Sequence, residues 1–237
     1  MRILAPVTGT FINVGAVLAG TATGLLVGGR LPESARQRVL AGLGLITLVV
    51  GVDLALAWRE TDPLYVLGGV LLGGLVGEAI GIERWLGRLG DRIQAAVSRG
   101  DGHSRVSEAF VTASLLFCVG PLTVVGSIQD GLTGDYEALA TKSMLDGFAS
   151  VALTATLGWG VALAAGTVLV IQGALSLGAG AFEDVLDGDA LHALTSAGGV
   201  LIIGISLKLL DLGDVKVGNF LPALVIAPAL VGVASLV

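Results

Sequence analysis

The stretch PLYVLGGVLLGGLVGEAIGI, residues 63–82, decides the fold class, because its twenty residues include a single charged side chain, Glu78. A helix needs about 20 predominantly apolar residues to cross the hydrocarbon core of a bilayer. Glycines recur at every fourth position, at Gly69, Gly73, Gly77 and Gly81, and such small-residue faces let helix backbones approach closely in lipid. The stretch therefore predicts a tightly packed membrane-spanning helix.

The rest of the chain has the same apolar character. Of its 237 residues, 54% are hydrophobic and only 14% are charged, and the mean hydropathy is +0.91. Soluble domains carry charge on about a quarter of their residues. The composition excludes a disordered chain, a nucleic-acid-binding protein and almost any soluble enzyme. It predicts an all-α, polytopic transmembrane helix bundle that forms a single integral membrane domain over residues 1–237, with the lipid bilayer as its partner.

Eight apolar stretches have the length of a membrane span. They lie at about residues 7–28, 38–58, 63–82, 107–128, 147–164, 166–182, 190–210 and 217–236. The fifth and sixth form one long apolar run, which we expect a tight turn at Ala165-Gly166 to divide.

The basic residues predict how these spans are oriented. With eight spans, alternate connections place ten of the thirteen basic residues on one side: Arg30, Arg36, Arg38, Arg84, Arg88, Arg92, Arg99, Arg105, Lys208 and Lys216. Only Arg2, Arg59 and Lys142 fall on the other side. Because cytoplasmic loops carry the excess of Lys and Arg, we expect both termini outside, in a multi-pass protein of the inner (plasma) membrane.

Residues 83–98 form an amphipathic segment between the third and fourth spans. Trp85, Leu89, Arg92 and Ala96 recur at helical spacing, with arginines on the other faces. Two interpretations are open: a cytoplasmic helix that lies on the inner leaflet, or a soluble helix packed on the protein. Residues 98–104, which include Gly100 and Gly102, follow as a linker.

Two distant parts of the chain resemble each other. Residues 48–54 read LVVGVDL and residues 201–207 read LIIGISL, at a constant offset, while Asn13 and Gln172 each lie about two turns into the first and sixth spans. The two repeats would cover about residues 7–82 and 166–236, on either side of central spans at about 107–164. Their starts are an odd number of spans apart, so the two repeats would cross the membrane in opposite directions. The pattern predicts an inverted-topology repeat, as in many secondary transporters.

Proline interrupts two of the predicted spans. Gly120-Pro121 lies in the fourth span, and Pro222 follows Asn219 in the eighth. Proline removes a backbone donor and bends or breaks a helix. Broken helices offer backbone groups to an ion or polar solute; the alternative is a pair of kinks whose freed groups are satisfied by neighbouring helices.

The stretch FVTASLLFCVGP at 110–121, with VGSIQDGL at 125–132, KSMLDG at 142–147, GTFIN at 9–13 and VGNFLPA at 217–223, resembles the prokaryotic membrane family DUF554. The resemblance covers nearly the whole chain and implies a multi-pass inner-membrane protein of unassigned function. Asp53 and Lys208 depart from the family pattern, so we set both aside. The candidate substrate- or ion-binding residues are then Asn13, Glu78, Ser127, Gln129, Asp130, Lys142, Asp146, Gln172 and Asn219.

No catalytic set accompanies these residues. His103 and His192 are single and far apart, and the chain has no metal-binding or cofactor motif. We therefore expect a protein that is not an enzyme and that binds no cofactor or metal. The sequence favours a small secondary transporter or channel for an ion or small polar solute; the alternative is a non-transporting scaffold, sensor, or lipid- or partner-binding protein. Glycines of residues 63–82 facing lipid would indicate a homodimer.

Overall fold

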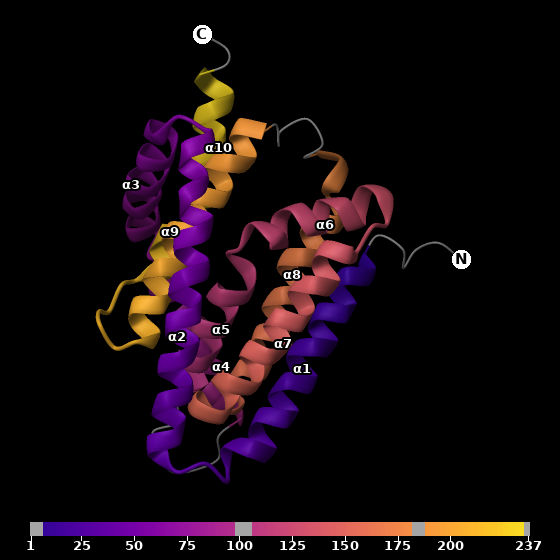
Figure 1. Ribbon diagram of the computed structural model, residues 1–237, viewed down its shortest axis with the longest axis vertical. Coiled ribbons are helices and arrows are strands. Elements are labelled where there is room, and N and C mark those ends of the chain that lie inside the picture. The colour runs from indigo at the N-terminus through magenta and orange to yellow at the C-terminus, as the bar shows by residue number, and fades with distance from the viewer. Residues whose placement is uncertain (1–6, 98–105, 182–187, 235–237) are drawn as a thin grey trace. The chain divides into compact units, whose positions relative to one another are not determined.

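The computed structural model describes residues 7–97, 106–181 and 188–234, and within them the regular secondary structure is helical throughout. The α-helices are α1 (Thr8–Gly28), α2 (Glu33–Ala55), α3 (Pro63–Ile80), α4 (Ile82–Val97), α5 (Val106–Cys118), α6 (Pro121–Thr133), α7 (Glu137–Leu157), α8 (Ala164–Leu177), α9 (Gly188–Leu209) and α10 (Ala223–Ala234). Four short 3-10 turns accompany α2, α8 and α10: η2 (Leu56–Glu60), η3 (Trp159–Leu163), η4 (Ala179–Ala181) and η5 (Val217–Phe220). Figure 1 shows these elements along the chain.

Six helical segments in the described part of the chain are long and apolar enough to cross a membrane. They are α1, α2 with η2, α3, η3 with α8, α9, and η5 with α10. A seventh crossing arises if the bent pair α5 and α6 counts as one span. The all-α class predicted from composition is confirmed for the described residues, with six candidate membrane-spanning segments where eight spans were predicted. The predicted linker at 98–104, and Arg2, Arg99 and Arg105, lie outside the described residues.

The chain folds as two compact units. Unit 1 contains α1, the start of α2, α4, α5, α6, α7 and α8, and unit 2 contains the rest of α2, α3, α9 and α10. Both units take segments from the first and the second half of the sequence, so each unit joins helices that are far apart along the chain.

Local sequence signals fix both ends of α3. The Asp62 carboxylate accepts the Leu64 N–H at 2.9 Å, and Pro63 occupies the first helical position, where its missing N–H is not needed. The helix ends at Gly81, whose φ of +75° is one that glycine adopts without strain. Gly81 therefore ends the helix and does not belong to the packing face predicted for it.

Both predicted helix breaks are present. At Gly120-Pro121, α5 and α6 meet at a bend of 60°, and the Thr123 hydroxyl donates to the Phe117 carbonyl at 3.0 Å, which satisfies one group near the break. At the other break, η5 ends at Phe220 and α10 begins only after Pro222.

The predicted turn at Ala165-Gly166 is wrong. Both residues lie inside α8, and the chain turns instead at Gly158, whose φ of +92° and ψ of −167° are open to glycine alone. The helix expected at 147–164 accordingly begins ten residues earlier, at Glu137, and ends at Leu157. The prediction assumed two spans of similar length and so put the turn near the middle of the apolar run. In the structure the turn lies at the glycine whose backbone conformation allows it.

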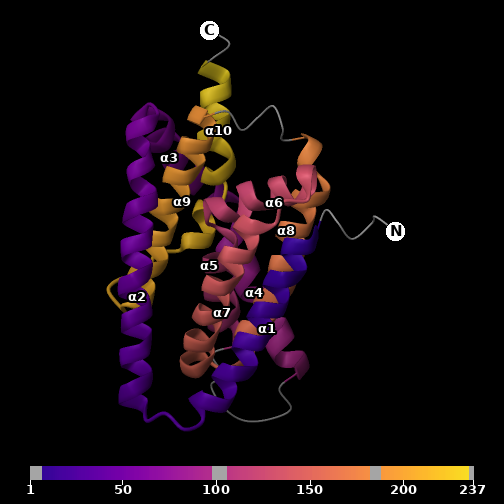
Figure 2. The same cartoon turned by 45° about the vertical axis from the view of Figure 1, so that its right-hand side comes forward.

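In unit 1, α1 packs against α7 along a glycine face. A Cβ added at Gly20 would lie 2.3 Å from the Gly147 carbonyl oxygen, and a Cβ at Gly24 would lie 2.7 Å from that of Val151. A Cβ at Gly28 would lie 2.8 Å from the Cα of Ala155. Both members of these pairs advance by four residues at each step, so the two helices run in the same direction. Figures 1 and 2 both show α1 and α7 side by side.

In unit 2, α3 packs against α10 in the same way, but the helices run in opposite directions. A Cβ at Gly69 would lie 2.5 Å from that of Ala227, and a Cβ at Gly73 would lie 2.5 Å from the backbone nitrogen of Ala223. A Cβ at Gly77 would lie 1.8 Å from the carbonyl oxygen of Asn219. The glycine face is therefore buried within the chain and gives no argument for a homodimer, which stays a prediction.

The amphipathic segment predicted at 83–98 is helix α4. It packs on the start of α5: a Cβ at Gly90 would lie 2.7 Å from the hydroxyl of Ser107, which donates to the Gly87 carbonyl at 3.2 Å. Trp85 is exposed. One face of α4 thus contacts protein. That another face lies on the inner leaflet stays a prediction.

Candidate functional site

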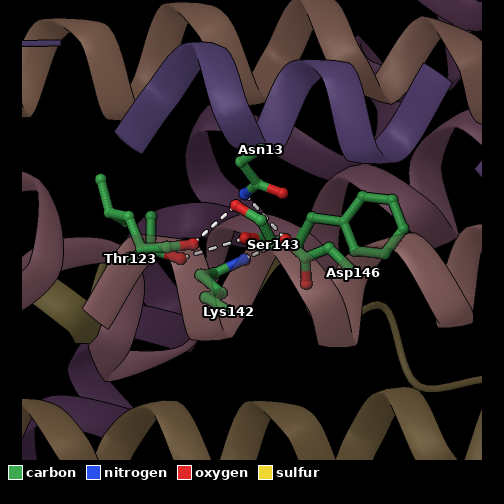
Figure 3. A network of polar contacts seen from close by, with 7 residues as sticks. Asn13, Thr123, Lys142, Ser143 and Asp146 are labelled. Carbon is green, nitrogen blue, oxygen red and sulfur yellow. Dashed lines mark hydrogen bonds and ion pairs between the residues drawn. The ribbon is translucent and has the colours of Figure 1, made fainter. Parts of the chain in front are cut away.

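An ion pair and an amide are buried together in unit 1. Lys142 and Asp146, one turn apart on α7, pair directly, and the Asn13 side chain of α1 donates from Nδ2 to the same Asp146 carboxylate at 2.9 Å. All three side chains are buried. Figure 3 shows Asn13 facing the pair from the neighbouring helix. Three of the predicted site residues therefore meet in one cluster, although Asn13 and Asp146 are 133 positions apart.

The spacing of these residues explains why α7 can bury two charges. Residues four apart lie on one face of a helix, so Lys142 and Asp146 neutralise each other within α7 and are buried against α1 as a pair without net charge. Asp146 lies nine residues from the start of α7, about 13 Å along the axis at 1.5 Å per residue. Removing one member of such a pair leaves an uncompensated buried charge, which is strongly destabilising.

Asp130 lies at the N-terminus of α1. It is buried, and its carboxylate accepts the Gly9 N–H at 2.9 Å and also lies against the backbone amides of Thr8 and Thr10. The first N–H groups of a helix have no partner within the helix, and negative charge is favourable at that end. A side chain of α6 thus caps a helix more than a hundred residues earlier in the chain.

Other buried polar groups in unit 1 have no hydrogen-bond partner in the described structure. Gln172 on α8 is 0% exposed, and neither its Oε1 nor its Nε2 is bonded. Ser127 Oγ on α6 and Asn13 Oδ1 on α1 are also unpaired and buried. Leaving a buried polar group unsatisfied costs about 1–3 kcal/mol, so their persistence together calls for an explanation. The sequence placed all three among the candidates.

Unit 2 holds a second polar cluster, and there each described side chain has a partner. Asn219 donates from Nδ2 to Glu78, and its Oδ1 accepts the backbone N–H of Glu83 at 2.8 Å. Glu83 in turn accepts the Gly218 N–H at 2.7 Å and lies 3.8 Å from the Lys208 ammonium nitrogen. Glu78 and Asn219 therefore join the end of α3 to the start of η5.

The structure separates the predicted residues into three groups. Asn13, Lys142 and Asp146 meet directly, with Ser127, Asp130 and Gln172 in the same unit; Glu78 and Asn219 meet in unit 2. Gln129 is exposed, because one residue turns a helix by about 100° and Asp130 occupies the buried face of α6. Two further buried hydroxyls that are unpaired, those of Thr10 and Ser176, were not among the predicted residues. Their spacing from Asn13 and Gln172, by three and four residues, is the signal that would have found them.

Chemically, the unit 1 cluster presents carboxylate, amide and hydroxyl groups from helices that are otherwise apolar. Such groups are rare inside membrane proteins and mark ion or substrate pathways, or hold helices together. The six apolar segments, with ionisable groups buried between helices, define a helical membrane protein.

The comparisons with known proteins agree with this class. The sequence model of a family described as "Protein of unknown function (DUF554)" matches residues 8–232, so the chain belongs to that family. It is 30% identical over 226 residues to an "Uncharacterized membrane protein YdfK" of Bacillus subtilis (strain 168), covering 94% of this chain and 95% of that protein. It is 31% identical over 231 residues to an "Uncharacterized protein YqgA" of Escherichia coli (strain K12), covering 93% and 94%. No solved structure matches the chain.

Proposed function

We propose that the protein is a small secondary transporter or channel for an ion or small polar solute, and that it is not an enzyme. The polar side chains of α1, α6, α7 and α8 in unit 1 bind the solute. The observation that carries the proposal is Gln172, a fully buried amide with neither of its polar atoms bonded in the described structure. A transported solute would supply the missing partners.

The proposal includes eight crossings of the inner membrane, and the directions of the helices support it. Helix α7 is not one of the six apolar segments, because Lys142 and Asp146 lower its hydropathy, but these two charges neutralise each other. If α5 with α6 is the fourth crossing and α7 the fifth, then α1 and α7 must run in the same direction. Their matched contacts have that direction. A re-entrant α5–α6 pair would make them antiparallel.

An inverted repeat of spans one to three with six to eight is the second part of the proposal. In support, each helix of the first repeat packs on its counterpart: α1 on α8, α2 on α9, and α3 on α10. The contact of α2 with α9 lies inside the matched sequences, where a Cβ at Gly51 would come within 2.9 Å of the backbone nitrogen of Ile203. Opposed halves of this kind form alternating gates in secondary transporters.

Cysteine labelling tests the predicted topology, with both termini outside. In a Cys118→Ser background, Asp135→Cys in the fourth connection should react with an impermeant maleimide added to intact cells. Asp214→Cys in the seventh connection should react only after the membrane is opened. Labelling of both from outside would contradict the eight-span arrangement.

A transport assay tests the function. The purified protein, reconstituted into liposomes, should carry a current or take up label from a panel of ions, amino acids and organic acids. The double variant Asn13→Leu with Gln172→Leu should abolish that flux while remaining monodisperse and folded. The same substitution at exposed Gln37, on the surface of α2, is the matched control.

Two outcomes would contradict the proposal. Undiminished flux in the double variant would remove Asn13 and Gln172 from the pathway. No flux for any solute, with a protein shown to be folded, would favour the alternative function as a membrane scaffold, sensor, or lipid- or partner-binding protein. In that case the polar groups of unit 1 only hold helices together.

A further inference from the structure

Three helices of unit 1 converge at Asp130. The Asp130 carboxylate of α6 accepts the Gly9 N–H of α1 at 2.9 Å. The next residue, Gly131, lies so close to α8 that an added Cβ would come within 2.1 Å of the Ser176 carbonyl oxygen. Helix α1 also packs on α8. Each of the three helices therefore contacts the other two, and the contacts of α6 with α1 and α8 lie at Asp130 and Gly131.

Each of the three helices carries buried, unpaired polar side chains within about one turn of these contacts. Thr10 follows Gly9 on α1, Ser127 lies one turn before Asp130 on α6, and Gln172 lies one turn before Ser176 on α8. All four of these side chains are buried, and none of the three hydroxyls nor the Gln172 amide has a hydrogen-bond partner in the described structure. A hydroxyl can turn to a carbonyl of its own helix, but a buried primary amide has no such local outlet. Gln172 therefore indicates a ligand at the junction.

The charges indicate the sign of that ligand. Among the buried ionisable groups of the described part of unit 1, Lys142 and Asp146 neutralise each other, and Asp130 adds one negative charge. The N-terminus of α1 offsets about half a charge. The carboxylate would repel an anion, whereas it and the neutral oxygens would attract a cation.

The ligand set also indicates the valence. Ca²⁺ sites take six to eight oxygens, usually with several carboxylates, and Mg²⁺ demands a near-ideal octahedron. In the described residues, no three His, Cys, Asp or Glu side chains form a group that fits a metal ion. A ligand set of one carboxylate and otherwise neutral hydroxyl and amide oxygens matches a single positive charge.

We propose that a monovalent alkali cation of the size of Na⁺ binds at the junction of α1, α6 and α8. Asp130 supplies the charge, and the oxygens of Thr10, Ser127, Gln172 and Ser176 supply neutral ligands. This inference deepens the proposed function, on which it rests: the cation is the transported or the coupling ion. The Lys142–Asp146–Asn13 cluster lies next to the site along α1 and is not part of its ligand set.

The test measures binding without transport. The melting temperature of the detergent-purified protein is followed in NaCl, LiCl, KCl and choline chloride at constant ionic strength, with Na⁺ as the titrated probe. At a hundred times its Kd, Na⁺ should raise the melting temperature by roughly 5–10 °C over choline, in a saturable way. Gln172→Leu and Ser127→Ala should weaken or abolish the Na⁺-dependent shift, and Gln37→Leu should keep it.

Equal melting temperatures in all four salts would overturn the proposal. So would a full Na⁺ shift in Gln172→Leu, provided that the variant melts cooperatively. Ser127→Ala removes only a hydroxyl, so it keeps the test decisive if the larger substitution unfolds the protein. Stabilisation by protons in place of Na⁺, with the wild type insensitive to every salt, would also overturn it.

The failures of the two proposals are distinguishable. Flux of a solute through liposomes without any cation-dependent shift would leave the transport function and remove the cation site. A Na⁺ shift that Gln172→Leu abolishes, without flux of any solute, would keep the site and remove the transport function.

Discussion

Both units of the molecule bury a side-chain amide among closely packed helices, but the two amides differ in their hydrogen bonds. In unit 2, Asn219 has bonds from both ends of its amide, to Glu78 and to the backbone of Glu83. In unit 1, the amide of Gln172 has none. Both amides are buried, and both units use close glycine packing. We interpret the unit 2 cluster as one that holds helices together, and under the proposed function the unpaired groups of unit 1 are those that a ligand would complete.

The largest expected effect is on the buried ion pair of unit 1. Lys142→Leu or Asp146→Leu should each destabilise the protein by about 3–5 kcal/mol, because each leaves an unpaired buried charge. The double variant should be more stable than either single variant, since it leaves no charge. Thermal unfolding of the four proteins in one detergent gives the comparison. Additive losses in the double variant would show that the two residues do not interact.

An intermediate effect is expected where glycines bring helices together in both units. Gly20→Ala in unit 1 and Gly77→Ala in unit 2 should each cost about 1–3 kcal/mol, because the added methyl meets backbone that cannot move aside. Gly15→Ala and Gly42→Ala are matched controls on α1 and α2 with open space around the added Cβ. The measurement is again the melting temperature, and equal loss at test and control positions would contradict the packing described.

The smallest effect is expected at the rim of the unit 2 cluster. The Lys208 ammonium lies 3.8 Å from Glu83 and is partly exposed, and such ion pairs contribute about 0–1 kcal/mol. Lys208→Met should change the melting temperature little, and added salt should change it equally in wild type and variant. A loss as large as that at Lys142 would mean that unit 2 also depends on a buried charge.

Much of this fold follows from local sequence. The breaks at Pro121 and Pro222 and the amphipathic helix α4 were predicted, because each depends on a few neighbouring residues. The start of α7 at Glu137 was missed, since hydropathy counts Lys142 and Asp146 as two charges although they form one neutral pair. The turn at Gly158 was misplaced because a conformation open only to glycine leaves no mark in a chain with 37 glycines.

The candidate site was predictable as a set of residues but not as an arrangement. The residue types indicated Asn13, Asp146 and Gln172, since polar side chains in apolar helices are exceptional. Their partners depend on contacts between helices more than a hundred positions apart, which a single sequence does not encode locally. Gln129 and Asp130 illustrate the limit: they are adjacent in sequence, and the packing of α6 exposes one and buries the other.

The most direct test of the distinction between the two clusters compares Gln172→Leu with Asn219→Leu, unfolded in parallel in choline chloride. Asn219→Leu should lower the melting temperature by roughly 2–10 °C, because it leaves Glu78 and the Glu83 amide without partners. Gln172→Leu should leave the melting temperature unchanged or raise it, because no bond is lost and an unsatisfied amide is removed from the core. Destabilisation by Gln172→Leu as large as that by Asn219→Leu would show that the unit 1 amide is already satisfied within the protein. That result would contradict the assignment of unit 1 as the binding unit.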